Sequence, residues 1–349
     1  MAPLGCNRLA DRMTPLRPLR VPEPVKESLR VMFIAKHARG SGEAHQIDGN
    51  HAVYHHEIAT VMRGIFRNVT IGNRFEDLFD KPDVDFIFSL LNRGGFLNSE
   101  MLAPLLATRH GIPFLGGSPI LRGLADDKHL MKMAARFRGV PTADWRVFRR
   151  GAPVEPIAGW SAERYVAKPN ASSASWGVVA AEGWDQLRDA IEHIHSEGHD
   201  ALVEPFLPGI DIEIPVIGHE GHAILPIMTF EHDPNVLRTY EEKRGFEESK
   251  AQLVPLEEGA LAEELRRHTE MLIPELWPFD YGRFEFRWNR ATGEVRFLEV
   301  NLQANIWSKR VIGQSAALAG LSHPDLIETI VCHSLVRHGL VQAEDVRAG

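Results

Sequence analysis

The chain has few cysteines, no long apolar run and no block of basic residues, and each absence excludes a class of protein. Only two cysteines, Cys6 and Cys332, occur among 349 residues, so a disulfide framework is excluded and a reducing cytoplasm is expected. No apolar run has the length of a membrane span, which argues against a membrane protein. No basic block offsets the net charge of −8, which argues against nucleic acid as a partner.

The remaining composition is that of a soluble globular protein with more than one unit. Hydrophobic residues make up 44% and charged residues 25% of the chain, and 349 residues suffice for two or three subdomains. Residues 1–27 are rich in Arg and Pro but have no apolar core like that of a signal peptide. We expect them to form a loose tail.

The stretch from Tyr281 to Lys309 has the clearest pattern. Charged and aromatic residues alternate from Arg283 to Trp288, which predicts a strand with one apolar face. Turn residues follow at 289–293, and 295–301 is the predicted return strand. If the strands pair, Glu285, Glu299 and Asn301 converge, and their oxygens are the ligands that Mg²⁺ takes beside substrate phosphates. The alternative is a solvated hairpin with ordinary surface charges.

Near the N-terminus, apolar segments alternate with helical ones. Strands are predicted at 29–35 and 85–91, and helices at 52–66 and 100–110. This alternation is typical of a parallel sheet with ligands at the carboxyl ends of its strands. An acidic helix is predicted at 256–272 and a last amphipathic helix from Ser322 onward.

The hairpin pattern Arg-x-Glu-Phe, a turn, then Phe-Leu-Glu-Val-Asn resembles the metal hairpin of the ATP-grasp superfamily. The nearest resemblance is to the D-alanine–D-alanine ligases, which usually have Asp where this chain has Glu285. Five motifs in the family's order extend the resemblance over about residues 29–338. It implies an α/β chain with an ATP-grasp fold: an N-terminal parallel-sheet domain at 28–121, a central subdomain at 122–203 and a C-terminal subdomain with the metal hairpin at 204–345.

The same resemblance implies a nucleotide site. Lysines would reach the phosphates, a Ser-rich loop at 170–177 would cover them, and the adenine would lie against the hinge near Glu204, with Asp211 on the ribose. The nucleotide-binding candidates are Lys128, Lys168, Ser175, Glu204, Phe206, Leu207, Asp211 and Lys243. Lys132 is a second lysine at the phosphates, and Glu213 is the alternative ribose acid.

The activity implied by the resemblance is ATP-dependent ligation with two Mg²⁺, for which Mn²⁺ is a substitute. A carboxylate attacks the γ-phosphate, and an amine then attacks the acylphosphate, releasing ADP and phosphate. Arg283, Lys243 and Ser175 are the catalytic candidates, and Glu285, Glu299 and Asn301 the metal ligands. The alternatives are a cell-wall D-alanine–D-alanine ligase, an ATP-grasp kinase and a non-catalytic nucleotide-binding protein.

Three departures from the family pattern predict different, still small and amino-acid-like substrates. Residues 92–95 replace a His-Gly loop, bulky Trp176 lies in the Ser-rich loop, and 302–310 lacks the Pro-Gly turn, with Trp307 adding bulk. Arg310 stands where the family has a serine for the acceptor carboxylate, and guanidinium binds carboxylate bidentately. For Lys309 and Arg310 the alternative is that both are surface charges. The substrate-binding candidates are Glu43, Asn92, Arg93, Ser308, Lys309 and Arg310. A homodimer is one option for assembly, and the 17 histidines are interpreted as surface or hydrogen-bonded residues.

Overall fold

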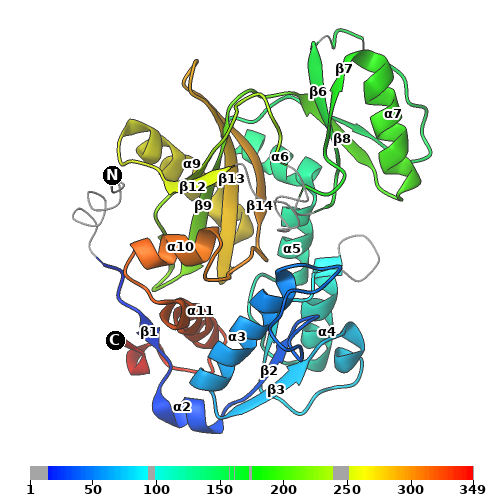
Figure 1. The fold of residues 1–349 in the computed structure, drawn as a ribbon. Helices are drawn as coiled ribbons and strands as arrows, with labels where there is room; N and C mark the ends of the chain where they lie inside the picture. The colour runs from blue at the N-terminus through cyan, green and yellow to red at the C-terminus, as the bar shows by residue number, and fades with distance from the viewer. Residues whose placement is uncertain are drawn as a thin grey trace.

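A computed structural model describes residues 15–92, 99–156, 158–160, 162–172, 175–238 and 251–348. Two of the predicted site residues, Arg93 and Lys243, lie outside these ranges. Figure 1 shows an N-terminal sheet with its helices below, a larger sheet above it, and a small sheet with one helix at the upper right. None of the helices in the described ranges is long and apolar enough to cross a membrane.

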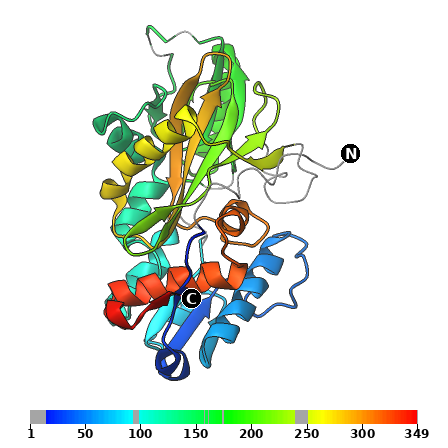
Figure 2. The same cartoon turned by 90° about the vertical axis from the view of Figure 1, so that its left-hand side faces the viewer.

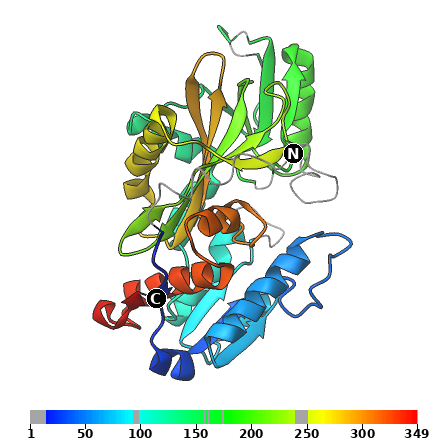
Figure 3. The same cartoon turned by 60° about the vertical axis from the view of Figure 1, so that its left-hand side comes forward.

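The N-terminal unit is built on three short parallel strands in the order β3-β2-β4. Its main strands and helices are β2 (Arg30–Ile34), α3 (His51–Ile65), β3 (Asn68–Gly72), β4 (Phe86–Ser89) and α4 (Leu102–His110), with 3₁₀ turns at Phe75–Leu78 and Ser99–Met101. Phe33 and Phe88 are fully buried with their rings edge to face, 5.3 Å apart. Apolar runs of this kind suit a parallel sheet covered on both faces, and Figure 3 shows α3 lying along it. The predicted strands and helices are confirmed with small shifts at their ends.

The central unit is a four-stranded antiparallel sheet with one helix against it. Its order is β5-β8-β6-β7, and α5 and α6 connect it to the N-terminal unit. The elements are α5 (Pro119–Asp126), α6 (Lys128–Phe137), β5 (Arg146–Phe148), β6 (Arg164–Pro169), β7 (Val179–Glu182), α7 (Gly183–Ser196) and β8 (Ala201–Pro205). The Asp127 carboxylate caps α6 by accepting from the backbone N–H of Leu130, which fixes the helix start next to Lys128.

The C-terminal sheet has the strand order β12-β11-β9-β13-β14, with β10 paired to β9. Its elements are β9 (Ile210–Gly218), β10 (His222–Ile224), β11 (Met228–Glu231), β12 (Gln252–Pro255), α9 (Ala260–Leu276), β13 (Tyr281–Asn289) and β14 (Glu294–Asn301). Phe284 and Phe286 point into an apolar cluster shared with α6 and α9. The alternation of the hairpin therefore leaves its charged side chains on the opposite face, and the predicted hairpin is confirmed.

Helix α9 begins at Ala260, four residues after the predicted start at Leu256. The difference comes from Leu256 itself, because its backbone N–H donates to the carbonyl of Ile227 and so continues the pairing of β12 with β11.

The chain ends by returning to the N-terminal unit, as Figure 2 shows for α11 between the two larger sheets. The remaining elements are β1 (Leu19–Arg20), α2 (Glu23–Ser28), α10 (Val311–Leu318), α11 (His323–Arg337), a 3₁₀ turn at Ala343–Asp345 and β15 (Arg347–Ala348). Buried Asp280 accepts hydrogen bonds from the Gly116 N–H (2.6 Å), the Ser334 hydroxyl (2.7 Å) and the Arg337 guanidinium (2.9 Å). This carboxylate joins the start of β13 to both α11 and the N-terminal unit.

Candidate active site

The polar face of the C-terminal sheet carries a row of charged residues across three strands. Glu285 on β13 is directly opposite Glu299 on β14, and Arg283 is opposite Asn301. On the other side of β13, Glu213 of β9 is opposite Glu285. The predicted metal candidates therefore lie together, from the middle of β13 to the end of β14, as the spacing of the hairpin indicates.

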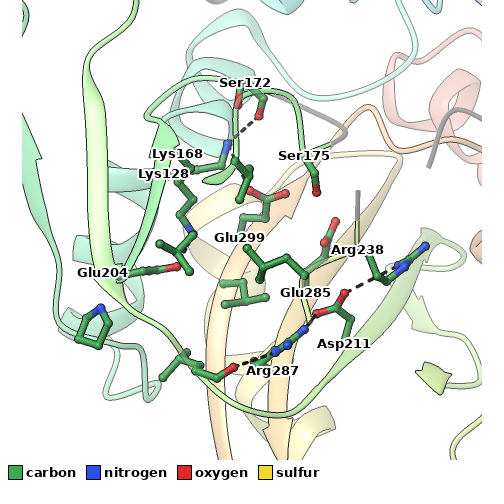
Figure 4. Close-up of a pocket in the computed structure, with 16 residues that line it drawn as sticks. Lys128, Lys168, Ser172, Ser175, Glu204, Asp211, Arg238, Glu285, Arg287 and Glu299 are labelled. Atoms are coloured by element: carbon green, nitrogen blue, oxygen red, sulfur yellow. Dashed lines mark hydrogen bonds and ion pairs between the residues drawn. The ribbon is translucent and has the colours of Figure 1, made fainter. Parts of the chain in front are cut away.

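A pocket runs between this face and the central sheet (Figure 4). It is lined by residues of α6, of both sheets and of the segments that connect their strands: Lys128, Val166, Lys168, Ser172, Ser175, Val178, Glu204, Pro205, Leu207, Asp211, Leu237, Arg238, Glu285, Arg287, Leu298 and Glu299. We call it the nucleotide pocket, because seven of the eight nucleotide-binding candidates lie within the described ranges and all but Phe206 line it. The Phe206 ring is covered instead by the Arg164 guanidinium, 4.1 Å from the ring centre.

Lys128 connects three parts of the pocket. Its ammonium donates to the Ser172 carbonyl (2.6 Å) and lies 3.3 Å from a Glu299 oxygen. Burial alone would lower the pKa of Lys128, but the nearby carboxylates of Glu299 and Asp126 outweigh it and raise the pKa. Lys128 is therefore a charged residue that contacts both the Ser-rich loop and the β13–β14 hairpin.

Glu204 is buried between two lysines. Lys168 donates to one of its oxygens (2.5 Å), and the ammonium of Lys132 lies 2.9 Å from the other. Burial would raise the pKa of Glu204, but the two ammonium groups hold it at about 2. Lys132 also donates to the Thr142 hydroxyl (2.7 Å) and does not line the nucleotide pocket. Glu204, itself paired with Lys132 outside the pocket, thus holds the ammonium of Lys168 in position.

Asp211 and the hinge are held by Arg287. The guanidinium of Arg287 donates to an Asp211 oxygen (2.6 Å) and to the Leu207 carbonyl (3.1 Å). Gly209, at a φ of +146°, has no room for a side chain, because a Cβ there would lie 2.3 Å from the Trp288 carbonyl oxygen. Asp211 lines the nucleotide pocket, whereas Glu213 does not.

The Ser-rich loop is partly described. Ser175 lines the nucleotide pocket with a left-handed backbone (φ +58°), which is the conformation that turns successive N–H groups toward an anion. Trp176 does not line the pocket, and its ring packs against that of His199, 5.1 Å away.

A second pocket adjoins the first, between the N-terminal unit and the same charged face. Its lining is His51, Tyr54, His55, Leu90, Asn92, Glu100, Glu213, Phe230, Arg238, Arg283, Glu285, Glu299, Asn301, Gln303, Asn305, Arg310 and Val311. We call it the substrate pocket. Arg238, Glu285 and Glu299 line both pockets, so they mark the junction between them.

Arg283 is bound to two carboxylates on the sheet. Its Nε atom lies 3.0 Å from a Glu213 oxygen and 3.0 Å from a Glu285 oxygen. Burial would lower the pKa of Arg283, but Glu213 and Glu285 raise it above its ordinary value. The guanidinium is held in place beside the junction.

The predicted substrate-binding residues fall into two groups. Asn92 and Arg310 line the substrate pocket. Glu43 and Lys309 are exposed, Ser308 is half-buried, and none of the three lines either pocket. Trp307 is buried in the N-terminal core and donates to Glu57 (2.8 Å), so its bulk fills the core rather than the substrate pocket.

The residues at the junction fit a divalent cation. Glu285 and Glu299 face each other in the strand register, and Asn301 continues the row on β14. Two carboxylates and an amide oxygen are hard donors of the kind that Mg²⁺ accepts. Both carboxylates line the pockets although Lys128 and Arg283 lie near them.

Sequence patterns do not single out Arg238, and they give Glu213 only as the alternative ribose acid. Arg238 has no motif around it, and its position at the junction comes only from the fold. Glu213 was considered for the ribose but lies in the substrate pocket with Arg283. Alternation along β9 indicates that Asp211 and Glu213 share a face of the strand. It does not indicate that Asp211 lines the nucleotide pocket and Glu213 the substrate pocket.

Three residues of the N-terminal loop, His37, His45 and Asp48, also come within ligand distance of one another. His37 contacts the Asp48 carboxylate at 2.8 Å, and the Lys36 ammonium lies 2.5 Å from the same oxygen. This group is therefore interpreted as an ion-paired loop, as expected for the histidines.

Comparison with known proteins gives one consistent result. A family model described as D-ala D-ala ligase C-terminus matches residues 135–332. The D-alanine–D-alanine ligase of Geobacter sulfurreducens is 27% identical over 266 residues, which cover 75% of this chain and 81% of the ligase. The uncharacterized protein y4sG of Sinorhizobium fredii is 29% identical over 65% of this chain and 68% of its own length.

Solved structures share the fold. A D-alanine–D-alanine ligase from Bacillus anthracis in complex with ATP has a TM-score of 0.71 at 20% identity, covering 90% of this chain and all (100%) of the ligase. The VanG D-Ala:D-Ser ligase from Enterococcus faecalis has a TM-score of 0.65 at 13% identity, covering 88% of this chain and 99% of the ligase.

Proposed function

This chain belongs to the D-alanine–D-alanine ligase family of ATP-grasp enzymes, and we propose that it joins a carboxylate to an amine through an acylphosphate. The observation that carries the proposal is the shared border of the two pockets. Glu285 and Glu299 line both the nucleotide pocket and the substrate pocket. A phosphoryl group bound beside these carboxylates is within reach of a substrate in the second pocket, which is the arrangement that transfer requires.

The nucleotide pocket supports ATP as the co-substrate. Lys128 and Lys168 supply positive charge to the phosphates, and Ser172 and Ser175 of the Ser-rich loop line the pocket beside these lysines. We assign Asp211 to the ribose and the Leu207 hinge to the adenine. Lys243 and Arg93, which lie outside the described residues, stay predictions for phosphate and substrate binding.

Two Mg²⁺ at Glu285, Glu299 and Asn301, with Mn²⁺ as a substitute, are part of the proposal. A divalent cation held there would neutralise negative charge of the phosphates. Glu285 and Glu299 hold their positions because they are paired in the hairpin register, and Lys128 offsets the charge of Glu299.

The chemistry requires little proton transfer from the protein. A carboxylate oxygen bonds to the γ-phosphorus and ADP leaves. The amine nitrogen then bonds to the carbonyl carbon, and phosphate leaves with that carboxylate oxygen. Arg283, held by Glu213 and Glu285, stabilises the negative charge of the tetrahedral intermediate. Catalysis therefore rests on positioning and charge neutralisation.

We propose that the substrates are small and amino-acid-like but differ from a pair of D-alanines. Arg310 lines the substrate pocket at the position where the family has a serine, and we assign it to the acceptor carboxylate. Assembly as a homodimer and a cytoplasmic location stay predictions.

The test is incubation with ATP, Mg²⁺ and pairs drawn from a panel of D- and L-amino acids, followed by nucleotide chromatography and mass spectrometry. We expect ADP, phosphate and an amide product in equal amounts. AMP with pyrophosphate, or a stable phosphorylated product as a kinase gives, contradicts the proposal. If D-alanine alone forms its dipeptide faster than any other pair forms product, the proposed difference in substrates is wrong.

A further inference from the structure

Arg238 is a buried cation at the junction of the two pockets. It is 8% exposed and lines both of them. The face of its guanidinium lies on the Phe230 ring, 3.4 Å from the ring centre. Stacking of this kind fixes the plane of the guanidinium and leaves its N–H edge for recognition.

The N–H edge of Arg238 is not satisfied within the described part of the chain. Its Nε and Nη1 atoms are buried there without a hydrogen-bond partner. Among the described residues, its Nη1 atom lies 3.6 Å from a Glu213 oxygen and 3.8 Å from an Asp211 oxygen, which are ion-pair distances longer than a hydrogen bond. Because buried N–H groups without a hydrogen-bond acceptor are costly, this edge is suited to an anionic ligand that supplies one.

Arg310 belongs to the same pocket. It lines the substrate pocket together with Arg238, Phe230 and Val311. Burial lowers the pKa of Arg310, and the positive charge of Arg238 lowers it further, against the effect of Glu213. Arg238 and Arg310 therefore act on one region of the pocket, and Arg283, which is bound to Glu213 and Glu285, adds its positive charge there.

Resting on the proposed function, we infer that the acceptor is an amino acid with an acidic side chain, whose two carboxylates bind to Arg310 and Arg238. We assign the donor carboxylate to the γ-phosphate beside Glu285 and Glu299, and the second carboxylate of the acceptor to the N–H edge of Arg238, which lines the same junction. In Figure 4 Arg238 lies beyond Asp211, on the side away from Lys128 and Lys168. A single carboxylate on the acceptor, bound to Arg310, supplies no acceptor to the Nε and Nη1 atoms of Arg238, which have none among the described residues.

The experiment compares each acid with its amide, which has nearly the same shape. Aspartate with asparagine, and glutamate with glutamine, in both chiral forms, are offered as acceptors to a panel of donors with ATP and Mg²⁺. We expect the acid to exceed its amide in kcat/KM by at least about tenfold, the scale of a lost charge-assisted hydrogen bond. In Arg238→Met this ratio falls to about 1, and Arg238→Lys restores part of it.

A comparison of KM values separates this inference from a structural role of Arg238. In Arg238→Met the KM for the acidic acceptor rises at least about tenfold more than the KM for its amide, because only the acid loses a carboxylate contact. Arg296→Met, at a half-buried hairpin position that lines neither pocket, is the matched control and keeps the acid-to-amide ratio. An acid-to-amide ratio of 1 or less in the wild type, or one that Arg238→Met leaves unchanged, overturns the inference.

Failure of the proposed ligase function can be distinguished from failure of the acidic-acceptor inference. Turnover of neutral pairs without preference for acids leaves the ligase intact and overturns only the acidic acceptor. If no pair gives product, calorimetric binding of glutamate and glutamine in the presence of ADP and Mg²⁺ decides. Binding of the acid that Arg238→Met abolishes supports the acidic ligand, and equal binding of both overturns it.

Discussion

The ammonium of Lys128 lies 3.3 Å from a carboxylate oxygen of Glu299, although 171 positions separate them in the chain. This ion pair joins the first turn of α6 to the metal hairpin, and the Ser172 carbonyl accepts from the same ammonium. The cation therefore sits between the loop proposed to cover the phosphates and the carboxylates proposed to hold Mg²⁺. On this proposal, binding of MgATP replaces a protein ion pair by phosphate and metal contacts.

Removing the charge of Glu299 tests the metal assignment. We expect Glu299→Gln to lower kcat by at least about 100-fold, because a ligand to the charge-neutralising cation is lost. The melting temperature should stay close to that of the wild type, since Glu299 is half-buried. Steady-state ADP release checks the first point and calorimetry the second. Glu294→Gln, an exposed change on the same strand, is the control, and full activity of Glu299→Gln would remove Glu299 from the site.

The ribose assignment predicts a loss of discrimination between nucleotides. Asp211 lines the nucleotide pocket and is bound to Arg287. If it accepts hydrogen bonds from the ribose, Asp211→Asn should raise the KM for ATP about tenfold and reduce the preference for ATP over 2′-deoxy-ATP. Glu213→Gln should keep that preference, because Glu213 lines the substrate pocket. The opposite pattern would move the ribose to Glu213.

Glu204 contributes stability that depends on pH. Its pKa is lowered from 4.5 to about 2 in the folded protein, so the folded state favours the ionised carboxylate. This contribution is complete above about pH 4.5 and is lost as the pH falls toward 2. Glu204→Gln leaves Lys132 and Lys168 without their carboxylate and should lower the free energy of unfolding at pH 7 by about 3 kcal/mol.

Urea denaturation of wild type and Glu204→Gln at several pH values measures that difference. It should shrink below about pH 4.5, whereas the exposed change Glu192→Gln on α7 should cost less than about 0.5 kcal/mol throughout. A difference that stays constant from pH 7 to pH 3 contradicts the assigned pKa.

Arg310 and Lys309 are neighbours in the sequence but not in their surroundings. Arg310 lines the substrate pocket, whereas Lys309 is exposed. We expect Arg310→Ala to raise the KM for the acceptor at least about tenfold, and Lys309→Ala to have a much smaller effect. An unchanged KM in Arg310→Ala removes the proposed carboxylate contact, and a larger effect of Lys309→Ala reverses the assignment.

The sequence predicted those parts of the site that local patterns determine. Alternation along 283–288 is a two-residue period, so it indicated which side chains of the hairpin share a face, and the register brings Glu285 and Glu299 together. The order of motifs predicted the ATP-grasp fold. Both signals lie within single strands or loops.

Contacts between segments that are distant in the chain could not be predicted from local sequence patterns. Stacking of Arg238 on Phe230 depends on how β11 and the segment after it cross the sheet. Trp307, expected to add bulk to the altered 302–310 run, packs into the N-terminal core because α11 returns there. The adjacent residues Lys309 and Arg310 carry the same charge, but their side chains have different surroundings. Strand and helix periodicity predicts the orientation of a side chain only within a regular element, and these residues lie in an irregular segment.

The most direct measurement of the central claim follows the oxygen of the donor carboxylate. A donor labelled with ¹⁸O in both carboxylate positions is incubated with ATP, Mg²⁺ and the acceptor that the panel identifies. Acylphosphate formation transfers one labelled oxygen to each phosphate released and leaves the other in the amide. Phosphate without label, or label recovered in AMP, would contradict an acylphosphate ligase.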